Sequence, residues 1–275
     1  MPNVQAFYDR NSEAEWARLD RHRTEFAVTL RVLSEFLPKP PASVLDIGGG
    51  PGRYAIALAS QGYAVTLVDI SEVSLALAQE KARAAGVALE QVLCADALDL
   101  SAIPSATYSS VLLMGPLYHL LTEEARFQAV KEALRVLKHN GLIFAAFITR
   151  FAPFRDSAQG YPEWVVENWE YATHVLKTGV HDGATGFTNA YFAHPGEIIP
   201  FMERAGFTTL GVVGCEGIVA GHEGKINALS GEAWERWVDL NYRLGQDPYL
   251  WGAADHLLYV GRKTVQSSLS ADRFA

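Results

Sequence analysis

A glycine-rich turn is the first feature of the sequence whose residue types could bind a ligand. Residues 46–52 read Asp-Ile-Gly-Gly-Gly-Pro-Gly, and they lie between a short apolar segment at 44–47 and a predicted helix at 53–61. Glycines allow positive φ and let a ligand approach the backbone closely. The free amides at the start of a helix attract negative groups and lone pairs. The turn therefore predicts a site for a small polar ligand.

Acidic residues stand at the ends of three successive predicted strands. Asp46 belongs to the strand at 44–47, Asp69 ends the strand at 64–68, and Asp96 ends the strand at 89–95. The carboxyl ends of such strands form the edge where doubly wound sheets bind ligands, and an acid after the second strand can accept hydrogen bonds from ribose hydroxyls. The alternative is that all three acids cap helices, but their agreement with the glycine turn favours a nucleoside-like ligand.

The spacing of the glycines distinguishes between two classes of nucleoside ligand. Counted from Gly48 and Gly50, the third glycine of the dinucleotide fingerprint would fall at position 53, which is Arg53. A dehydrogenase also usually has an apolar residue where this sequence has Asp46. A nicotinamide-dependent oxidoreductase is therefore the weaker alternative.

The elements that must position these residues follow an alternating pattern of strands and helices. Such alternation predicts an α/β fold with a parallel sheet and right-handed crossovers. We expect a doubly wound sheet of seven strands with helical, aromatic-rich insertions that form a lid. The further strands are expected at 108–114, 141–148, 207–215 and 256–260, and helices at 12–37, 74–85, 122–137, 194–205 and 230–244.

The same pattern predicts how the chain is divided. Residues 1–41 are expected to form an N-terminal helical cap, whose first ten residues are a short lead-in. Residues 42–149 are expected to form the ligand-binding core. The segment 150–193 is rich in aromatic residues and too long for an ordinary crossover, so we expect a helical lid there. Residues 194–263 complete the core with a second helical insertion, and 264–275 form a flexible tail.

The composition restricts the partners and the compartment. The chain has 31 acidic and 23 basic residues and a net charge of −8 at pH 7, which makes nucleic acid a poor partner. Cys94 and Cys215 are predicted to be buried free thiols, which suggests a reducing compartment. We expect no signal peptide, and no apolar run reaches about 20 residues. We expect a soluble cytoplasmic protein without membrane contact, and the sequence leaves its oligomeric state open.

Between Ser43 and Phe147 the sequence resembles the class I S-adenosylmethionine-dependent methyltransferases, which have a Rossmann-like sheet. Residues 44–52 resemble the first motif of that family, and residues 113–120 resemble its fourth-strand motif. The resemblance implies that S-adenosylmethionine is the cofactor. It also implies these cofactor-binding residues: Asp46, Gly48, Gly49, Gly50 and Gly52 for the methionine part, Asp69 for the ribose, Ile70, Asp96 and Ala97 for the adenine, and Met114 and Gly115.

Methyl transfer from a sulfonium needs positioning above all, and a base only where the acceptor must lose a proton. His119 follows the fourth strand and is the candidate base, and Tyr118 is expected beside it as a wall of the catalytic site. If His119 is the base, activity should rise with pH as His119 loses its proton, near about pH 6.5 if its pKa is unperturbed. The alternative is a purely structural role, in which His119 forms a hydrogen bond within the fold and Tyr118 packs against its neighbours.

Two residues of the N-terminal cap are further candidates for cofactor binding. Tyr8 could close over the cofactor, and Arg23 could meet the cofactor carboxylate, although a packed aromatic and a surface arginine are the alternatives. No metal site is expected, because the histidines lack ligand spacing. These histidines are His181, His194, His222 and His256.

The sequence therefore predicts an enzyme that methylates a small molecule with S-adenosylmethionine. Oxygen is expected as the acceptor atom before nitrogen or sulfur. A protein that binds the cofactor without transferring its methyl group is the main alternative.

Overall fold

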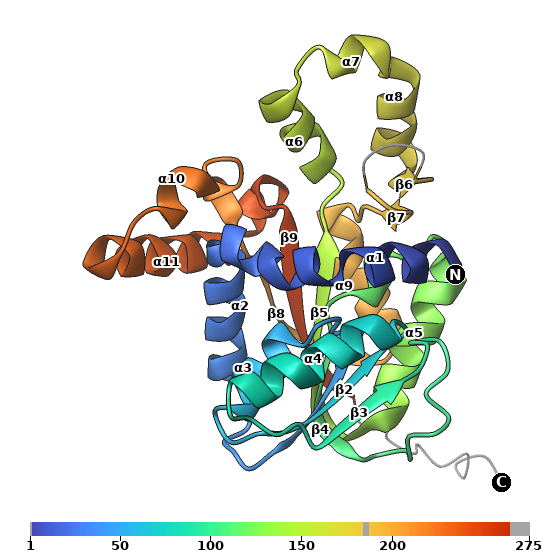
Figure 1. Cartoon of the computed structure of the whole chain (residues 1–275). Coiled ribbons are helices and arrows are strands. Elements are labelled where there is room, and N and C mark those ends of the chain that lie inside the picture. Colours follow the sequence, from blue (N-terminus) through green and yellow to red (C-terminus); the bar gives the residue numbers. More distant parts are fainter. Residues whose placement is uncertain (1, 184–186, 265–275) are drawn as a thin grey trace, which may run out of the picture.

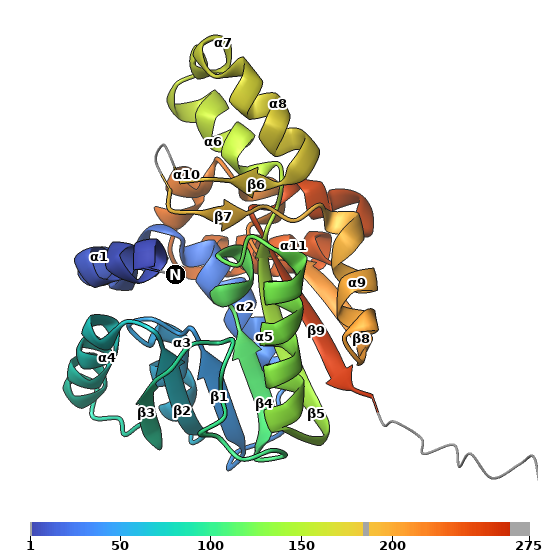
Figure 2. The ribbon, with the colours of Figure 1, turned by 90° about the vertical axis from the view of Figure 1, so that its right-hand side faces the viewer.

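The computed structural model describes residues 2–183 and 187–264, so the predicted tail lies outside the described residues apart from Thr264. A seven-stranded sheet forms the centre of the molecule, in the order β3-β2-β1-β4-β5-β9-β8 (Figure 2). The predicted number of strands and the α/β class are confirmed. The strands are β1 (Ser43–Ile47), β2 (Ala64–Asp69), β3 (Gln91–Cys94), β4 (Tyr108–Leu113), β5 (Leu137–Ile148), β8 (Phe207–Gly214) and β9 (His256–Lys263).

The sheet is mixed rather than wholly parallel. Strands β1 to β5 pair in parallel, but β9 runs antiparallel to both β5 and β8. The chain between β8 and β9 stays at the end of the sheet where β8 stops, because both α11 (Gly231–Gly245) and the 3-10 helix at Pro248–Ala253 pack against β8. The chain must therefore re-enter the sheet from the edge where it left, which reverses the last strand.

Helices cover both faces of the sheet, and a separate apolar core lies on each face. One face packs against α5 (Glu123–Val136) and α9 (Pro195–Arg204), and the other against α2 (Arg23–Phe36), α3 (Arg53–Ala59), α4 (Glu72–Ala84) and α11. Continuous apolar strands such as β1 fit this arrangement, since a strand covered on both faces has no polar side. Thr122 and Ser71 begin α5 and α4 as N-caps, each accepting a backbone N–H three residues ahead.

The N-terminal segment is more ordered than the sequence suggested. The expected lead-in at 1–10 is wrong: α1 extends over Pro2–Arg21, and the chain breaks at His22 before α2 begins. Helix α1 lies across the edge of the sheet and packs against α4 (Figure 1). Its polar contacts with α4 include a hydrogen bond between Ser12 and Ser74 and one from Ser71 to Asp9.

The insertion at 150–193 is helical, as predicted, and stands away from the body of the molecule (Figure 1). Val166 and Trp169 are 81% and 63% exposed, so much of its apolar surface faces solvent. The insertion contains α6 (Ala152–Gly160), α7 (Trp164–Glu167), α8 (Trp169–Thr178), β6 (Val180–His181) and β7 (Ala190–Tyr191); the second excursion contains α10 (Glu223–Asn227) and α11. Within the described residues, no helix is long and apolar enough to cross a membrane.

The two cysteines differ in their surroundings. Cys215 is buried, as predicted, but Cys94 is exposed. The prediction for Cys94 is wrong because β3 is the edge strand of the sheet, so its last residue pairs with β2 on one side and has no strand on the other.

A buried ion network joins the break between α1 and α2 to the start of β9. Arg18 donates to both carboxylate oxygens of Glu25, at 2.7 and 2.8 Å. His256 Nδ1 lies 2.5 Å from Glu216 and 3.8 Å from Glu25. These carboxylates raise the pKa of His256 to about 9 despite its burial. His256 is therefore a largely buried cation with a side chain that is 17% exposed, held between two acids from distant parts of the chain.

This network predicts a loss of stability at alkaline pH. The pKa of His256 is raised from 6.5 to about 9 on folding, so its stabilising effect is complete below about pH 6.5 and is lost as pH rises to about 9. The loss should reach up to about 3 kcal/mol. Urea unfolding across this range should show a flatter profile for His256→Gln, whereas His174→Gln, at an exposed position, should keep the wild-type profile. Equal slopes for wild type and His256→Gln would contradict the network.

Candidate active site

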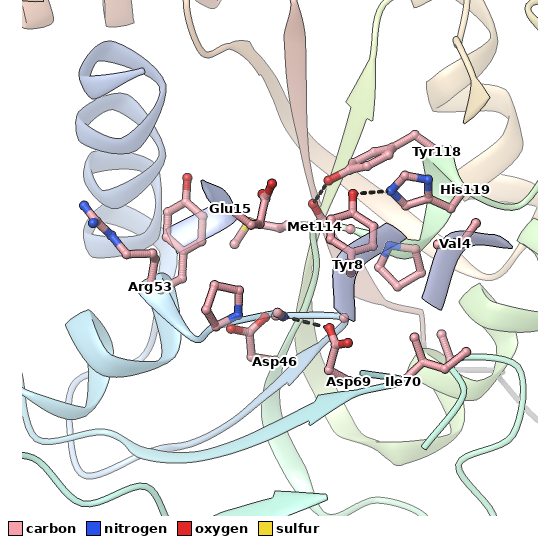
Figure 3. A pocket seen from close by; sticks show the side chains of 18 of the residues that line it. Val4, Tyr8, Glu15, Asp46, Arg53, Asp69, Ile70, Met114, Tyr118 and His119 are labelled. Atoms are coloured by element: carbon pink, nitrogen blue, oxygen red, sulfur yellow. Dashed lines mark hydrogen bonds between the residues drawn. The ribbon is translucent and has the colours of Figure 1, made fainter. Parts of the chain in front are cut away.

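The main cavity of the described residues lies at the carboxyl ends of β1, β2 and β4, and α1 forms its opposite wall (Figure 3). The space between its walls is about 1040 Å³, including the part open to solvent. Most of the predicted site residues line it: Tyr8, Asp46, Gly48, Gly49, Gly50, Asp69, Ile70, Asp96, Ala97, Met114, Gly115, Tyr118 and His119.

The glycine turn folds closely over Asp46. Gly48 has a φ of +69°, and a Cβ there would lie 2.6 Å from the ring of Pro116. A Cβ on Gly49 would lie 2.5 Å from Asp46 Oδ2. By contrast, a Cβ on Gly50 would meet nothing within 4 Å, so this part of the turn is open. The glycines therefore let the backbone pass over a buried carboxylate and face the cavity.

Asp46 is 1% exposed, and its Oδ2 atom has no hydrogen-bond partner among the described residues. Burial, and then the nearby charge of Asp69, raise the pKa of Asp46 to about 7. An unpartnered carboxylate in a cavity wall is costly unless a ligand supplies a donor or a positive charge. Asp46 thus marks where a cationic or hydrogen-bond-donating group would bind.

Asp69 is held in place by the backbone. Its Oδ2 accepts the N–H of Gly50, and its Oδ1 the N–H of Ser71, both at 2.8 Å. Burial raises the pKa of Asp69, and these hydrogen bonds oppose that shift. Because a carboxylate oxygen can accept more than one hydrogen bond, Asp69 can still receive a pair of ligand hydroxyls.

His119 is 7% exposed and makes two hydrogen bonds that define its tautomer. Its Nδ1 lies 3.1 Å from the carbonyl oxygen of Asn189, so Nδ1 must donate. Its Nε2 lies 2.6 Å from the Tyr8 hydroxyl, which therefore donates to it. Burial lowers the pKa of His119 to about 4. The buried ring therefore stays neutral well below the unperturbed value of 6.5, and the role of His119 as a base stays a prediction.

The Tyr118 hydroxyl also donates its proton to a hydrogen bond within the protein. Its hydroxyl donates to the carbonyl oxygen of Met114 at 3.0 Å, and burial raises its pKa. Its ring meets that of His119 edge-on, with the centroids 4.7 Å apart. Tyr118 therefore forms a wall of the cavity, as predicted from the sequence.

Two predicted site residues lie outside the cavity. Arg23 donates to the carbonyl oxygen of Asn227 and stacks over Trp234 at 4.2 Å, because α2 begins at Arg23 and directs it toward α10 and α11. Gly52 is the N-cap of α3, with a φ of +81°, and a Cβ there would lie 3.1 Å from Ala78 Cβ. Gly52 is therefore needed for packing of the turn against α4. The structure does not bring Arg23 or Gly52 to the cavity wall, and their contact with the cofactor stays a prediction.

The structure adds charged residues that the sequence analysis missed. Arg18, Glu15 and Arg53 all line the cavity. Glu15 accepts Arg18 Nε at 3.1 Å, while Arg53 bonds Asp20 and stacks over Trp16 at 4.8 Å. Glu15 and Arg18 lie within the helix predicted at 12–37, and their spacing places them on one helical face, but that spacing alone does not show that the face turns toward the cavity.

The insertion at 150–193 contacts residues of the site but does not line the cavity. None of its described residues lines the cavity, where the direct cover is α1. The Phe187 ring lies 5.6 Å from His119 and 6.1 Å from Phe7. The Phe187 ring and the Asn189 carbonyl oxygen therefore join the insertion to the loop that carries His119. A lid role for the insertion stays a prediction.

Four histidines were considered as metal ligands. Of these, the described structure places only His256 between two carboxylates. The ligand atoms of Glu25, Glu216 and His256 lie within 4.8 Å of one another. Arg18 and protonated His256 already neutralise these acids. The geometry is accounted for by ion pairing, and the expectation of no metal site stays a prediction.

Comparison with known proteins places this geometry in a family. Residues 44–141 match the model of a methyltransferase domain. A curated Geobacillus relative, named as a candidate methyltransferase, is 35% identical over 102 residues, which are 36% of this chain and 40% of the relative. A Coxiella burnetii relative, named ubiquinone biosynthesis O-methyltransferase, is 26% identical over 68% of this chain and 72% of its own length.

Solved structures share the fold. A Thermotoga maritima protein titled as a SAM-dependent methyltransferase superposes with a TM-score of 0.58 at 20% identity, covering 94% of this chain and 99% of that one. Residues 44–141 therefore match a methyltransferase domain, and structures titled as SAM-dependent methyltransferases share its fold. S-adenosylmethionine is the cofactor that this family implies. The residues present fit it, because the open glycine turn and the unpartnered Asp46 offer the backbone approach and the charge that it requires.

The burial of Asp46 predicts how the free protein responds to pH. Its pKa rises from 3.8 to about 7 on folding, so stability is highest below about pH 4 with respect to this group and falls as pH rises through 7. The loss should reach up to about 4 kcal/mol. Asp46→Asn should remove this loss in thermal unfolding of the cofactor-free protein, while Glu80→Gln, at an exposed position on α4, should not. An unchanged profile for Asp46→Asn would show that the carboxylate is solvated.

Proposed function

We propose that the whole chain transfers the methyl group of S-adenosylmethionine to a small-molecule acceptor in this cavity. The observation that carries the proposal is Asp46, a buried carboxylate with one unpartnered oxygen under an open glycine turn. The methyltransferase family of residues 44–141 supports the same function. When bound, the cofactor supplies an electrophilic methyl group on a sulfonium.

The cavity residues divide into groups that would bind different parts of the cofactor. Asp46 and the turn Gly48–Gly50 would hold the methionine part, where Asp46 meets positive charge. Asp69, fixed by two backbone N–H groups, would accept the ribose hydroxyls. Ile70, Asp96 and Ala97 would enclose the adenine. Tyr8, Met114 and Gly115 lie on the remaining wall, between the glycine turn and His119.

A small molecule is the acceptor that the cavity favours. Helix α1 covers the carboxyl edge of the sheet and lines the cavity through Tyr8, Glu15 and Arg18, which leaves room for a compact ligand only. The net charge of −8 disfavours nucleic acid. The curated relative named ubiquinone biosynthesis O-methyltransferase supports a small acceptor.

Catalysis in this cavity depends mainly on positioning. The Nε2 atom of His119 already accepts the Tyr8 hydroxyl, so His119 holds Tyr8 and α1 over the site instead of presenting a free base. Fixed orientation of two reactants can itself lower a barrier by several kcal/mol. The decisive assay is formation of S-adenosylhomocysteine with a panel of small acceptors, with NAD as a competing ligand. Tight binding of the cofactor without turnover of any acceptor would instead support the non-methylating alternative.

Asp69→Ala should weaken cofactor binding by roughly 10- to 150-fold, which is the scale of about 1.5–3 kcal/mol for hydrogen bonds to a charged group. Calorimetric titration with S-adenosylmethionine measures this directly. Asp156→Ala, at an exposed position on α6, is the matched control and should bind as wild type does. Unchanged affinity in Asp69→Ala would rule out the ribose role.

Cofactor binding should slow hydrogen exchange in α1 more than in the helices of the insertion. Helix α1 lines the cavity, whereas α6, α7 and α8 do not, so closure over the cofactor orders α1 first. If 150–193 is a lid for the acceptor, its exchange should slow only when an acceptor is also present. Protection of 150–193 equal to that of the central strands in the free protein would contradict the lid.

A further inference from the structure

We propose that the methyl acceptor is a neutral nitrogen, in an amine or a nitrogen heterocycle, rather than a hydroxyl group. This inference rests on the proposed function and names its acceptor class. It is drawn from the wall beside His119, made of Tyr8, Glu15, Met114 and Tyr118, which all line the cavity (Figure 3). The polar atoms of this wall that remain available are acceptors of hydrogen bonds.

The two tyrosine hydroxyls have both given their protons to the protein. Tyr8 donates to His119 Nε2 at 2.6 Å, which is required because His119 Nδ1 donates to the Asn189 carbonyl. Tyr118 donates to the Met114 carbonyl at 3.0 Å. Each phenol oxygen therefore keeps only lone pairs for a ligand. A ligand group beside them must supply N–H or O–H donors.

The charges on the same wall disfavour an anionic nucleophile. Glu15 uses one oxygen for Arg18 Nε, and the rest of the Arg18 guanidinium is held by both oxygens of Glu25. Arg18 thus has two carboxylates of its own chain and offers little charge to a ligand. An ionised phenol or thiol would face Glu15 and, beneath the turn, Asp46. A neutral amine would meet no such repulsion, and its N–H groups would match the free oxygens.

His119, the base expected from the sequence, is poorly suited to a hydroxyl acceptor, because its Nε2 lone pair is occupied and burial lowers its pKa to about 4. Asp46, whose pKa is about 7, is assigned to the cofactor by the proposed function. A neutral amine needs no base before it reacts. Its lone pair forms the N–C bond, the electron pair of the broken C–S bond stays on sulfur, and the N–H proton then leaves the product ammonium for solvent.

The test uses pairs of compounds that differ only in the reacting group and whose amine is neutral at pH 7, such as 2-naphthylamine with 2-naphthol and aniline with phenol. Binding of each compound is measured by calorimetry with S-adenosylhomocysteine present, and methyl products are identified by mass spectrometry with saturating S-adenosylmethionine. The amine of at least one pair should bind about tenfold or more tightly than its hydroxyl partner and should be the one methylated. Equal or better binding and methylation of the hydroxyl partner would overturn the proposal, as would binding of neither member of any pair.

Variants identify the atoms responsible. Tyr8→Phe and Tyr118→Phe each remove one acceptor oxygen and should raise the KM for the amine roughly 3- to 10-fold, with a smaller change in kcat. Tyr249→Phe, at a 96% exposed tyrosine, is the matched control and should behave as wild type. An unchanged KM in both site variants would contradict recognition by these oxygens.

The pH profile gives an independent readout. With an arylamine, which is unprotonated throughout neutral pH, the rate at saturating cofactor should be flat, whereas base-dependent attack by a hydroxyl would rise with pH. The groups facing the wall are Tyr8, Glu15, Arg18, Asp46, Asp69, Tyr118 and His119. Saturating cofactor keeps Asp46 ionised, so its titration in the free protein does not enter the profile. Cofactor affinity, measured alone, tests the proposed function separately from the acceptor class.

Discussion

The burial of an acid under the glycine turn is the constraint on which the site depends. Asp46 ends up 1% exposed because β1 is central in the sheet and the turn that follows passes directly over its carboxylate. Only glycine can occupy position 49 without striking that carboxylate. The protein therefore keeps a costly, partly unpartnered charge in the cavity wall. Such a group is stabilised when a ligand with a positively charged group binds beside it.

The second constraint is the fixing of α1 across the edge of the sheet. Tyr8 bonds His119, Asp9 accepts from Ser71, and Arg18 pairs with Glu25 at the break before α2. These contacts enclose the cavity and, at the same time, use up the hydrogen-bonding capacity of the candidate base. A site whose groups are already satisfied by one another is preorganised for positioning, and it offers a ligand mostly lone pairs.

Local patterns in the sequence were sufficient for most of the fold and much of the cavity. Apolar runs predicted the strands that carry Asp46 and Asp69, because a strand covered on both faces must be continuously apolar. The glycine turn and the residues after strands one to four then follow, since parallel strands bring their carboxyl ends to one edge. The sequence context of Gly52 does not distinguish a glycine needed for packing from one that faces a ligand.

Tertiary structure alone decided what covers the edge and how its groups are charged. The direction of β9 depends on where α11 packs, and Arg23 turns toward α10 because a break at His22 rotates α2. His256 becomes a buried cation only where Glu25 and Glu216 meet it. The sequence by itself determined the alternation of elements and the acids at the strand ends, because these depend on neighbouring residues. Burial, pairing and protonation depend on contacts between segments that are about 40 to more than 200 residues apart, and no local pattern encodes those contacts.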